Sequence, residues 1–342
     1  MSGPTQIAKV YSGTDPKVRD RQVEQSPVLS LVVPMYNEEA ALKRFFETVE
    51  PVLASIGLGY EIICVNDGSK DATLAELYRR ATQDARIKVL DLSRNFGKEA
   101  ALSAGLDAAQ GQAIIPMDAD LQEPPDLLPQ MVALWRQGFD VVLAKRTDRK
   151  SDTWFKRFSA KLFYRLIRGL SDVDIPANVG DFRLMDRQVN EALRRLPERT
   201  RFMKGLFAWL GFRQTEIEFV RPRRQDGAGK QNLRRLIGLA MDGVISFSTV
   251  PLRMWGYLGF VVAGFAFCYG MFIVLKTLVF GVDTPGFATL ATVLLFFNGL
   301  LMINLGVLGE YVTRIFTEVK GRPLYLVRER INFESEDAPS DR

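Results

Sequence analysis

Short apolar runs rich in valine and isoleucine recur through the first half of the chain, and polar or glycine-containing turns follow them. The runs cover Leu29–Val33, Glu61–Val65, Ile87–Leu92, Ile114–Pro116 and Val141–Ala144. A short apolar run, a turn and then a helical pattern are typical of strand–loop–helix units in a parallel sheet. The pattern therefore predicts an α/β fold for this part of the chain.

Polar clusters follow three of these predicted strands, at Pro34–Glu39, Asn66–Asp71 and Met117–Gln122. In an open α/β sheet, ligands bind in the crevice at the carboxyl ends of the strands, so the clusters should share one edge. Asp118 and Asp120 are two residues apart and point to the same side of an extended segment. Carboxylate oxygens suit Mg²⁺ or Mn²⁺, which proteins usually share with substrate phosphates. An isolated Asp-x-Asp is more often a polar turn, but the neighbouring clusters favour a site.

The C-terminal third contains two long stretches without a charged residue, Met254–Leu275 and Thr284–Gly309. Because about 20 apolar residues span the hydrocarbon core of a bilayer, we expect two transmembrane helices forming a hairpin, at about 254–277 and 286–309. The alternative is a buried helical hairpin in a soluble protein, which such long stretches do not favour.

Two further stretches are amphipathic at helical spacing. Between Asp152 and Gly169, apolar side chains recur at helical spacing and basic side chains can lie on the opposite face of the helix. Residues 232–252 carry a similar apolar stripe before the first predicted span. Next to a membrane anchor, this pattern favours interfacial helices, although an ordinary surface helix gives the same spacing.

Basic residues flank the predicted spans on the outer sides, whereas the link between the spans holds only Lys276 and Asp283. The flanking residues are Arg234, Arg235 and Arg253 before the spans, and Arg314, Lys320, Arg322, Arg328 and Arg330 after them. The positive-inside bias therefore predicts a multi-pass protein with both termini and the α/β domain in the cytoplasm.

The amino-acid composition excludes several classes of active site and binding partner. The sequence has no histidine, which excludes a histidine-based serine triad and His-ligated zinc, and its two cysteines are too few for a disulfide framework. The net charge of +5 is modest, but basic residues gather in Lys145–Lys161, in Arg221–Arg235 and after Glu310, which fits an anionic lipid surface. Because no nucleic-acid-binding motif is present, we expect no nucleic-acid partner. Residues 1–26 are polar, lack an apolar signal-peptide core and predict a flexible tail.

The order and spacing of several motifs resemble those of glycosyltransferase family 2, in the branch that transfers sugars to polyprenyl phosphates. That branch includes bacterial bactoprenol (undecaprenyl phosphate) glucosyltransferases and, more distantly, dolichol-phosphate mannose synthases. The matching segments are Val33–Glu39, Val65–Asp71, Ser93–Glu99, Met117–Gln122, Gly180–Met185 and Leu196–Arg199. The resemblance implies a Rossmann-like GT-A catalytic domain over 27–231, followed by a juxtamembrane helix over 232–252, transmembrane helices within 253–312 and a cytoplasmic tail over 313–342. It also implies a location in the bacterial inner membrane.

The same resemblance implies roles for individual side chains. The residues expected to contact the nucleotide of the donor are Pro34, Tyr36, Glu38, Asp67, Lys98 and Asp118. Those expected around a Mg²⁺ or Mn²⁺ ion are Asp118, Asp120 and Gln122, with Asp120 counted as catalytic through the metal. A mobile loop over the donor diphosphate would contribute Arg221, Arg224 and Lys230, although Gly229 and Gln231 stand where relatives generally have a serine and an aromatic residue.

The acceptor implied by the resemblance is a lipid monophosphate, which is largely ionised near neutral pH because its second pKa is about 6. Such a nucleophile needs positioning and charge neutralisation more than a general base. Arg146 and Arg157 are candidates for binding its phosphate, because guanidinium groups match phosphate oxygens. Asp181 is then expected to orient the sugar or a phosphate-binding arginine, with a salt bridge to Arg183 or Arg187 as the alternative.

The resemblance implies an inverting, metal-dependent transfer of one sugar, glucose from UDP-glucose, to undecaprenyl phosphate at the cytoplasmic leaflet, with release of UDP. The same reaction with N-acetylglucosamine, galactose or mannose is the nearest alternative. A non-catalytic membrane scaffold that retains the fold is another. A homo-oligomer, a lipid-sugar flippase and a downstream glycosyltransferase are the further partners that the resemblance implies.

Overall fold

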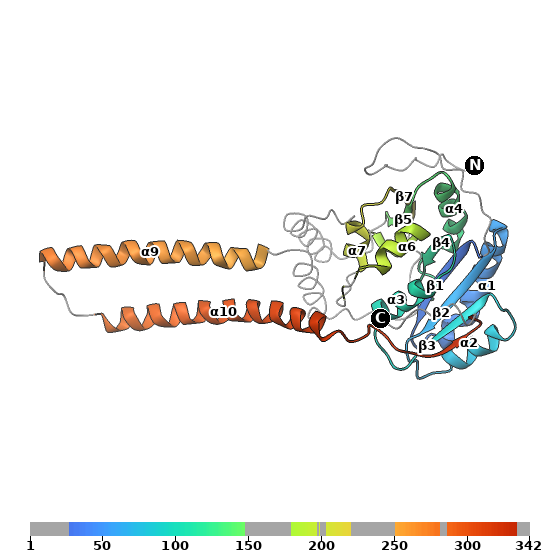
Figure 1. The fold of residues 1–342 in the computed structure, drawn as a ribbon, viewed down its shortest axis with the longest axis horizontal. Coiled ribbons are helices and arrows are strands. Elements are labelled where there is room, and N and C mark those ends of the chain that lie inside the picture. Colours follow the sequence, from blue (N-terminus) through green and yellow to red (C-terminus); the bar gives the residue numbers. More distant parts are fainter. Residues whose placement is uncertain are drawn as a thin grey trace. The chain divides into compact units, whose positions relative to one another are not determined.

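The computed structural model describes residues 27–147, 179–196, 198, 203–219, 250–280 and 286–333. Two compact units make up the chain. The first contains an α/β sheet and the last described residues, and the second contains two long helices (Figure 1). The predicted N-terminal tail and both predicted amphipathic helices, at 152–169 and 232–252, lie outside the described residues, apart from the last three residues of the second, which begin the first long helix.

The first unit is built on an eight-stranded sheet in the order β7-β5-β6-β4-β1-β2-β3-β8. The five strands predicted from the apolar runs are β1 to β5. The strands are β1 Leu29–Met35, β2 Tyr60–Asn66, β3 Ile87–Leu92, β4 Ala113–Pro116, β5 Val141–Arg146, β6 Val179–Asp186, β7 Gln214–Phe219 and β8 Val327–Ile331.

The sheet is mixed, because β6 and β8, which the apolar runs did not predict, run antiparallel to their neighbours. Strands β3, β2, β1 and β4 are parallel neighbours, as the strand–loop–helix pattern predicts. Strand β6 lies between β4 and β5 and runs antiparallel to both, so it starts at the edge where the parallel strands end. That direction brings the first residues of β6 to the same edge as the three polar clusters.

Helices cover both faces of the sheet. Alternate side chains of the central strands pack with α1, α2 and α4 in one apolar core, while α3 packs on the opposite face. The approach of α3 is close, because a Cβ at Gly105 would lie 2.3 Å from Val32 Cγ1. The helices are α1 Glu39–Ile56, α2 Thr73–Ala81, α3 Lys98–Ala108, α4 Leu128–Arg136, α6 Arg187–Arg194 and α7 Met203–Trp209, with a 3₁₀ turn, η1, at Pro125–Leu127.

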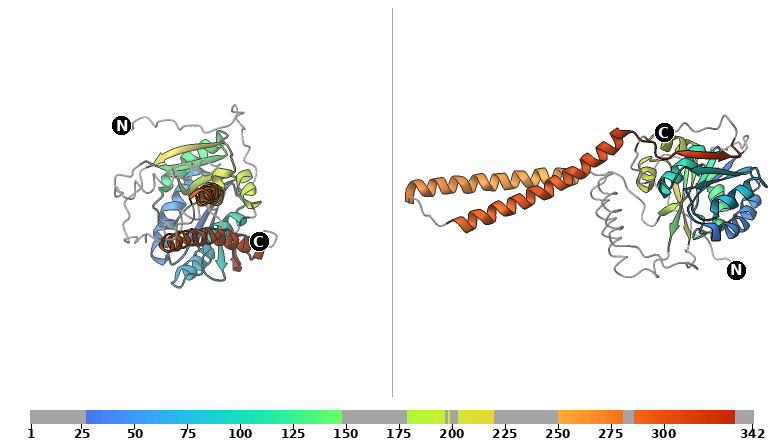
Figure 2. Two further views of the ribbon diagram at one scale, coloured as in Figure 1. Left: turned by 90° about the vertical axis from the view of Figure 1, so that its left-hand side faces the viewer. Right: turned by 90° about the horizontal axis from the view of Figure 1, so that it is seen from below.

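Residues near the end of the chain return to the sheet. Strand β8 pairs antiparallel with β3 at the edge of the sheet, and Figures 1 and 2 show it in red beside that strand. The sequence analysis assigned 313–342 to a cytoplasmic C-terminal tail, and within that range Val327–Ile331 forms a strand of this sheet. Three of the five residues of β8 are charged, as suits an exposed edge strand, and the segment lacks the apolar run of a central strand.

The described part of the second unit contains α9 Val250–Phe280 and α10 Phe287–Lys320, of 31 and 34 residues. Both helices extend beyond the predicted spans, and α10 continues eleven residues past Gly309. Among the described residues, one stretch, Phe296–Lys320, is long and apolar enough to cross a membrane. The transmembrane hairpin and its topology remain predictions.

Candidate active site

The loops after β1 and β2 are joined by hydrogen bonds at the carboxyl edge of the sheet. Asn37, in a left-handed conformation with φ 54°, donates its backbone N–H to Ser69 Oγ at 3.0 Å and accepts the N–H of Lys70 at 2.8 Å. The N–H of Glu38 donates to Thr73 Oγ1 at 2.9 Å. Two of the predicted polar clusters therefore form one structural unit.

The predicted nucleotide-binding residues of β1 lie in or beside this unit. Pro34 is a partly buried residue of β1, and Glu38 is also partly buried. Tyr36 is a large aromatic side chain left 43% exposed. An aromatic ring exposed at this edge offers a surface for stacking a base.

Asp67 connects the second loop to the loop before α3. Its Oδ1 accepts the N–H of Phe96 at 2.7 Å, and its Oδ2 accepts the N–H of Gly97 at 2.9 Å. Burial raises the pKa of Asp67, while these two hydrogen bonds act in the opposite direction. An ionised carboxylate has about four acceptor positions, so Asp67 retains capacity for a ligand N–H.

The turn at Gly68 makes that arrangement possible. Gly68 has φ 66°, and a Cβ there would lie 2.6 Å from both the carbonyl carbon of Arg94 and the nitrogen of Asn95. Only glycine allows the two loop backbones to approach this closely without strain.

Lys98 brings two of the predicted site residues together. Its Nζ lies 2.6 Å from Asp118 Oδ1 and 3.3 Å from Asp181 Oδ2. The three side chains come from the start of α3, the segment after β4 and the start of β6. Partial burial disfavours the ammonium charge, but the two carboxylates outweigh it and raise the pKa of Lys98 above its usual value.

Glu123 is a third carboxylate in this group that the sequence analysis does not identify. It accepts the backbone N–H of Asp118 at 3.2 Å. Burial, and then the charge of Asp118, raise the pKa of Glu123 to about 8. Its position five residues after Asp118, in the same turn, was the available sequence signal.

Asp120 and Gln122 lie beside this cluster and contact each other. Gln122 donates its side-chain amide to Asp120 Oδ2 and its backbone N–H to Asp120 Oδ1, the latter at 3.1 Å. Leu121 between them has φ 52°, so the turn folds back on itself. Asp120 is exposed to solvent.

The donor atoms of this segment fit a divalent cation shared with a ligand. Asp118 and Asp120 offer the hard oxygens that Mg²⁺ and Mn²⁺ prefer. Within the described ranges, no group of three or more His, Cys, Asp or Glu side chains could hold a metal ion. Two carboxylates with the remaining positions filled by phosphate oxygens and water match the usual Mg²⁺ arrangement.

Arg183, on β6, is a second residue that the sequence analysis leaves without a binding role. Its Nη2 donates to the carbonyl of Gly180 at 2.7 Å and its Nε to that of Asp181 at 3.3 Å. The guanidinium also lies 3.9 Å from the centre of the Phe207 ring. Burial lowers the pKa of Arg183 to about 10, still well above neutral pH. These contacts fix the backbone that carries Asp181.

Of the two arginines predicted to bind the acceptor phosphate, Arg146 is described. It is the last residue of β5, and its Nε is buried without a hydrogen-bond partner among the described residues. The neighbouring Lys145 pairs with Glu216 at 2.7 Å. Four other predicted binding residues lie outside the described ranges, namely Arg157, Arg221, Arg224 and Lys230.

Comparison with known proteins identifies the family. Residues 30–194 match the model of glycosyl transferase family 2. The chain is 52% identical to the uncharacterized glycosyltransferase sll0501 of Synechocystis sp., over 88% of this chain and 95% of that protein. It is 46% identical to the bactoprenol glucosyl transferase of Shigella phage SfII, over 88% and 97% of the two chains.

Among solved structures, glucosyl-3-phosphoglycerate synthase from Mycobacterium tuberculosis in complex with Mn²⁺, UDP and phosphoglyceric acid matches at 19% identity and a TM-score of 0.46. The match covers 71% of this chain and 84% of that one. Each of these two sequence relatives matches 88% of the chain. The chain therefore belongs to glycosyltransferase family 2 and is a glycosyltransferase.

Proposed function

We propose that this glycosyltransferase transfers a single glucose from UDP-glucose to undecaprenyl phosphate, with inversion at the anomeric carbon and release of UDP. The observation that carries the proposal is the 46% identity to a bactoprenol glucosyl transferase over nearly the full length of both chains. The convergence of Lys98, Asp118 and Asp181 at one edge of the sheet supports it, since these charges can act on a diphosphate sugar.

In this proposal the donor lies across the carboxyl edge of the sheet. Tyr36, Glu38 and Asp67 contact the base, with Pro34 forming the floor beside them. Lys98 faces the diphosphate, because its ammonium is the cation placed between the carboxylates of the site. Arg221, Arg224 and Lys230 extend the set of diphosphate contacts by family resemblance.

Asp118, Asp120 and Gln122 would hold a Mg²⁺ or Mn²⁺ ion. A bound ion offsets the negative charge that develops on the leaving diphosphate. Asp118 is already oriented by Lys98 through its side chain and by Glu123 through its backbone N–H. Gln122 orients the carboxylate of Asp120.

The acceptor phosphate binds beside Arg146 and Arg157 and attacks the anomeric carbon directly. The buried Nε of Arg146 supports this role, because a phosphate oxygen would supply the partner that the described residues do not. An ionised phosphate has no proton to lose, so Asp181 orients the sugar and Lys98 instead of acting as a base.

The same proposal places the enzyme in the cytoplasmic membrane, with α9 and α10 as two spans and the catalytic unit on the cytoplasmic side. The length and apolar character of the two helices support it. This arrangement gives the active site access to cytosolic nucleotide sugars and to the phosphate groups of the inner leaflet.

A panel of nucleotide sugars tests the proposal directly. Full-length enzyme in detergent, with undecaprenyl phosphate and Mg²⁺ or Mn²⁺, should convert UDP-glucose to an organic-soluble, mild-acid-labile product faster than it converts other donors. Asp120→Asn serves as the control and should lower turnover by about 100-fold, because it removes ligand charge beside the leaving diphosphate. Preference for a GDP-sugar, or full activity of Asp120→Asn, would contradict the proposal.

A further inference from the structure

The segment Arg322–Asn332, here called the C-terminal strap, follows α10 and adds the edge strand β8 to the catalytic sheet. Helix α10 ends at Lys320, and Gly321 adopts a left-handed conformation with φ 64° that redirects the chain. The strap therefore begins immediately after the last apolar helix (Figures 1 and 2).

Both ends of the strap are attached to the α/β unit by side chains. Tyr325, only 1% exposed, donates its hydroxyl to Asp107 Oδ2 on α3 at 2.8 Å. At the other end, Asn332 donates its side-chain amide to the carbonyls of Ala81 and Ile87, both at 2.8 Å. These specific contacts, of which the one at Tyr325 is buried, show that the strap is part of the folded domain.

Between these attachments, Arg328 reaches a buried carboxylate. Its Nε lies 2.7 Å from Asp91 Oδ2, and its Nη2 contacts the same oxygen. Asp91 is 1% exposed, so its charge depends on hydrogen-bond partners to remain stable inside the protein. The guanidinium of Arg328 supplies a positive charge to this site from the surface.

The other oxygen of Asp91 continues the chain of contacts towards the active site. Asp91 Oδ1 accepts the side-chain N–H of Asn66 at 2.7 Å, and Asn66 Oδ1 accepts the backbone N–H of Ser69 at 3.2 Å. Asn66 is completely buried. The amide orientation of Asn66 is thereby fixed, with its nitrogen towards Asp91 and its oxygen towards Ser69.

The turn held in this way, Asn66–Ser69, carries Asp67 and Gly68. It also presents Ser69 Oγ to Asn37 in the loop after β1. Without Arg328, Asp91 would lose the charged partner that holds its carboxylate in the orientation that accepts the Asn66 amide, and the amide would in turn be held less firmly towards Ser69. A change in the strap would therefore be transmitted to the loops at the nucleotide edge.

We propose that Arg328 is a positioning residue of the active site, which acts through Asp91 and Asn66 to hold the Asn66–Ser69 turn in the geometry that binds the donor nucleotide. The turn geometry follows from the contacts above, and its use in donor binding rests on the proposed function. The strap thus makes the residues that follow the apolar helices a necessary part of the catalytic unit.

Hydrogen exchange and nucleotide binding of full-length protein in detergent test this inference. Arg328→Gln should raise the exchange rate of the peptide containing Ser69 by about tenfold or more and weaken UDP binding by about tenfold, with a smaller change in kcat. Arg328→Lys keeps the charge and should recover part of both effects. Glu329→Gln is the matched control on the same strand, because Glu329 accepts a surface hydrogen bond from the Tyr78 hydroxyl. This substitution should leave the exchange rate at Ser69 and the affinity for UDP unchanged.

Unchanged exchange at Ser69 in Arg328→Gln would overturn the inference, as would a loss of thermal stability with unaltered UDP affinity. If Arg328→Gln does not fold, Asp91→Asn removes the same ion pair at nearly constant volume and should produce the same local exchange. Absence of UDP binding by the unaltered protein would overturn the proposed donor instead, while the exchange measurement would still decide the role of Arg328.

Discussion

A single ammonium group organises the carboxylates of the candidate site. Lys98 Nζ contacts Asp118 and Asp181, which are separated by 63 positions in the sequence, and Glu123 stands behind Asp118. Asp118 and Asp181 place two carboxylates beside the one ammonium of Lys98, whereas the pKa of Glu123, raised to about 8, leaves that group largely uncharged near neutral pH. Carboxylates in this position can take part in binding a cation, consistent with a metal-assisted reaction on a diphosphate.

Asp181 provides a prediction about proton transfer. Because the phosphate acceptor needs no base, Asp181→Asn should lower kcat by about tenfold or more through lost orientation of the sugar and of Lys98. The factor should stay nearly constant between about pH 6.5 and pH 8.5. Steady-state rates of both proteins across this range check the expectation.

A different pH profile would point to a different role. If the unaltered enzyme shows a limb in its pH–rate profile and Asp181→Asn removes that limb, Asp181 acts as a general base. Lys43→Gln, on the exposed surface of α1, is a control that should follow the unaltered profile.

Strand positions allowed part of this site to be predicted from the sequence. Asp67 and Asp118 follow apolar strands, and the topology rule brings the ends of parallel strands together. The role of Arg183 depends on the antiparallel direction of β6, and that of Arg328 on pairing with Asp91 across 237 positions. No local pattern specifies such distant contacts, so these residues became apparent only in the structure.

At the scale of elements, strands with continuous apolar runs were predictable and edge strands were not. The predicted run Ile87–Leu92 coincides with β3, whereas β8 has the sequence VRERI, whose charges resemble those of a solvated tail. Edge strands expose one side to solvent and commonly carry charges, so their signal is weak. Neighbouring polar contacts, as on α2, are easier to predict because they depend on helical spacing.

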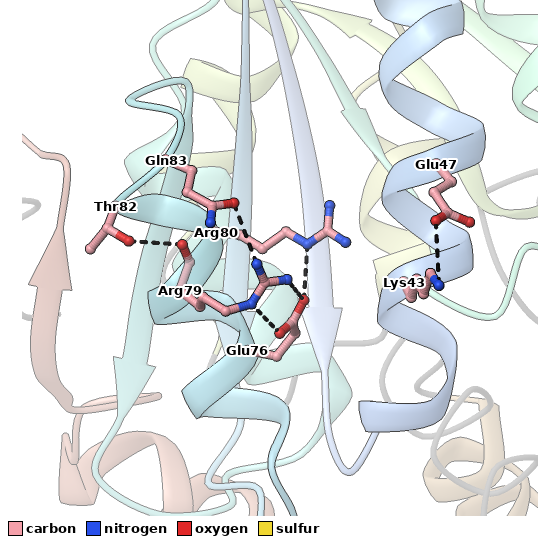
Figure 3. Close-up of polar contacts among 7 residues, drawn as sticks. All are labelled: Lys43, Glu47, Glu76, Arg79, Arg80, Thr82 and Gln83. Carbon is pink, nitrogen blue, oxygen red and sulfur yellow. Dashed lines mark hydrogen bonds and ion pairs between the residues drawn. The ribbon is translucent and has the colours of Figure 1, made fainter.

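Helix α2 provides a prediction about acid stability. Glu76 accepts hydrogen bonds from Arg79 Nε at 2.8 Å and Arg80 Nε at 3.0 Å, as Figure 3 shows. The Arg79 hydrogen bonds are the main cause that lowers the pKa of Glu76 to about 2, below the value of about 4.3 in an unfolded chain. A lowered folded-state pKa stabilises the protein above the unfolded-state value, and this contribution is lost as pH falls through the folded-state value.

Glu76→Gln should therefore lower the thermal midpoint by about 1 to 2 °C at pH 7, as expected for a partly exposed ion-pair cluster on the protein surface. The difference from the unaltered protein should shrink progressively below about pH 4.5 and disappear near pH 2. Thermal unfolding in detergent at several pH values measures this. Glu47→Gln on α1 is the control, since Glu47 lies 4.0 Å from Lys43 at an exposed position (Figure 3). A difference that grows in acid would contradict the role of Glu76.

At the scale of the whole molecule, the proposed orientation of α9 and α10 across the membrane determines whether the active site has access to cytosolic nucleotide sugars. The positive charges outside the predicted spans favour the proposed topology, in which both termini lie in the cytoplasm. A cysteine introduced at Gly281 should therefore react with an impermeant thiol reagent applied to intact cells, whereas one at Ser335 should react only after permeabilisation.

The two native cysteines could also react with the thiol reagent in that experiment. Cys64 is buried in β2, but Cys268 is exposed on α9, so labelling should be performed with Cys268→Ala as the background. Reaction at position 335 from outside, with protection at position 281, would reverse the proposed topology and separate the catalytic unit from cytosolic nucleotide sugars.

The position of β8 in the chain also affects biosynthesis. Ribosomes deliver the N-terminal part first, so seven strands emerge before either apolar helix and the eighth only after both. Until then the outer edge of β3 has free backbone donors and acceptors, a state that invites pairing with other chains. A chain terminated within α10 would lack β8, the strand that pairs with this edge of β3. We therefore expect such a chain to aggregate or be degraded.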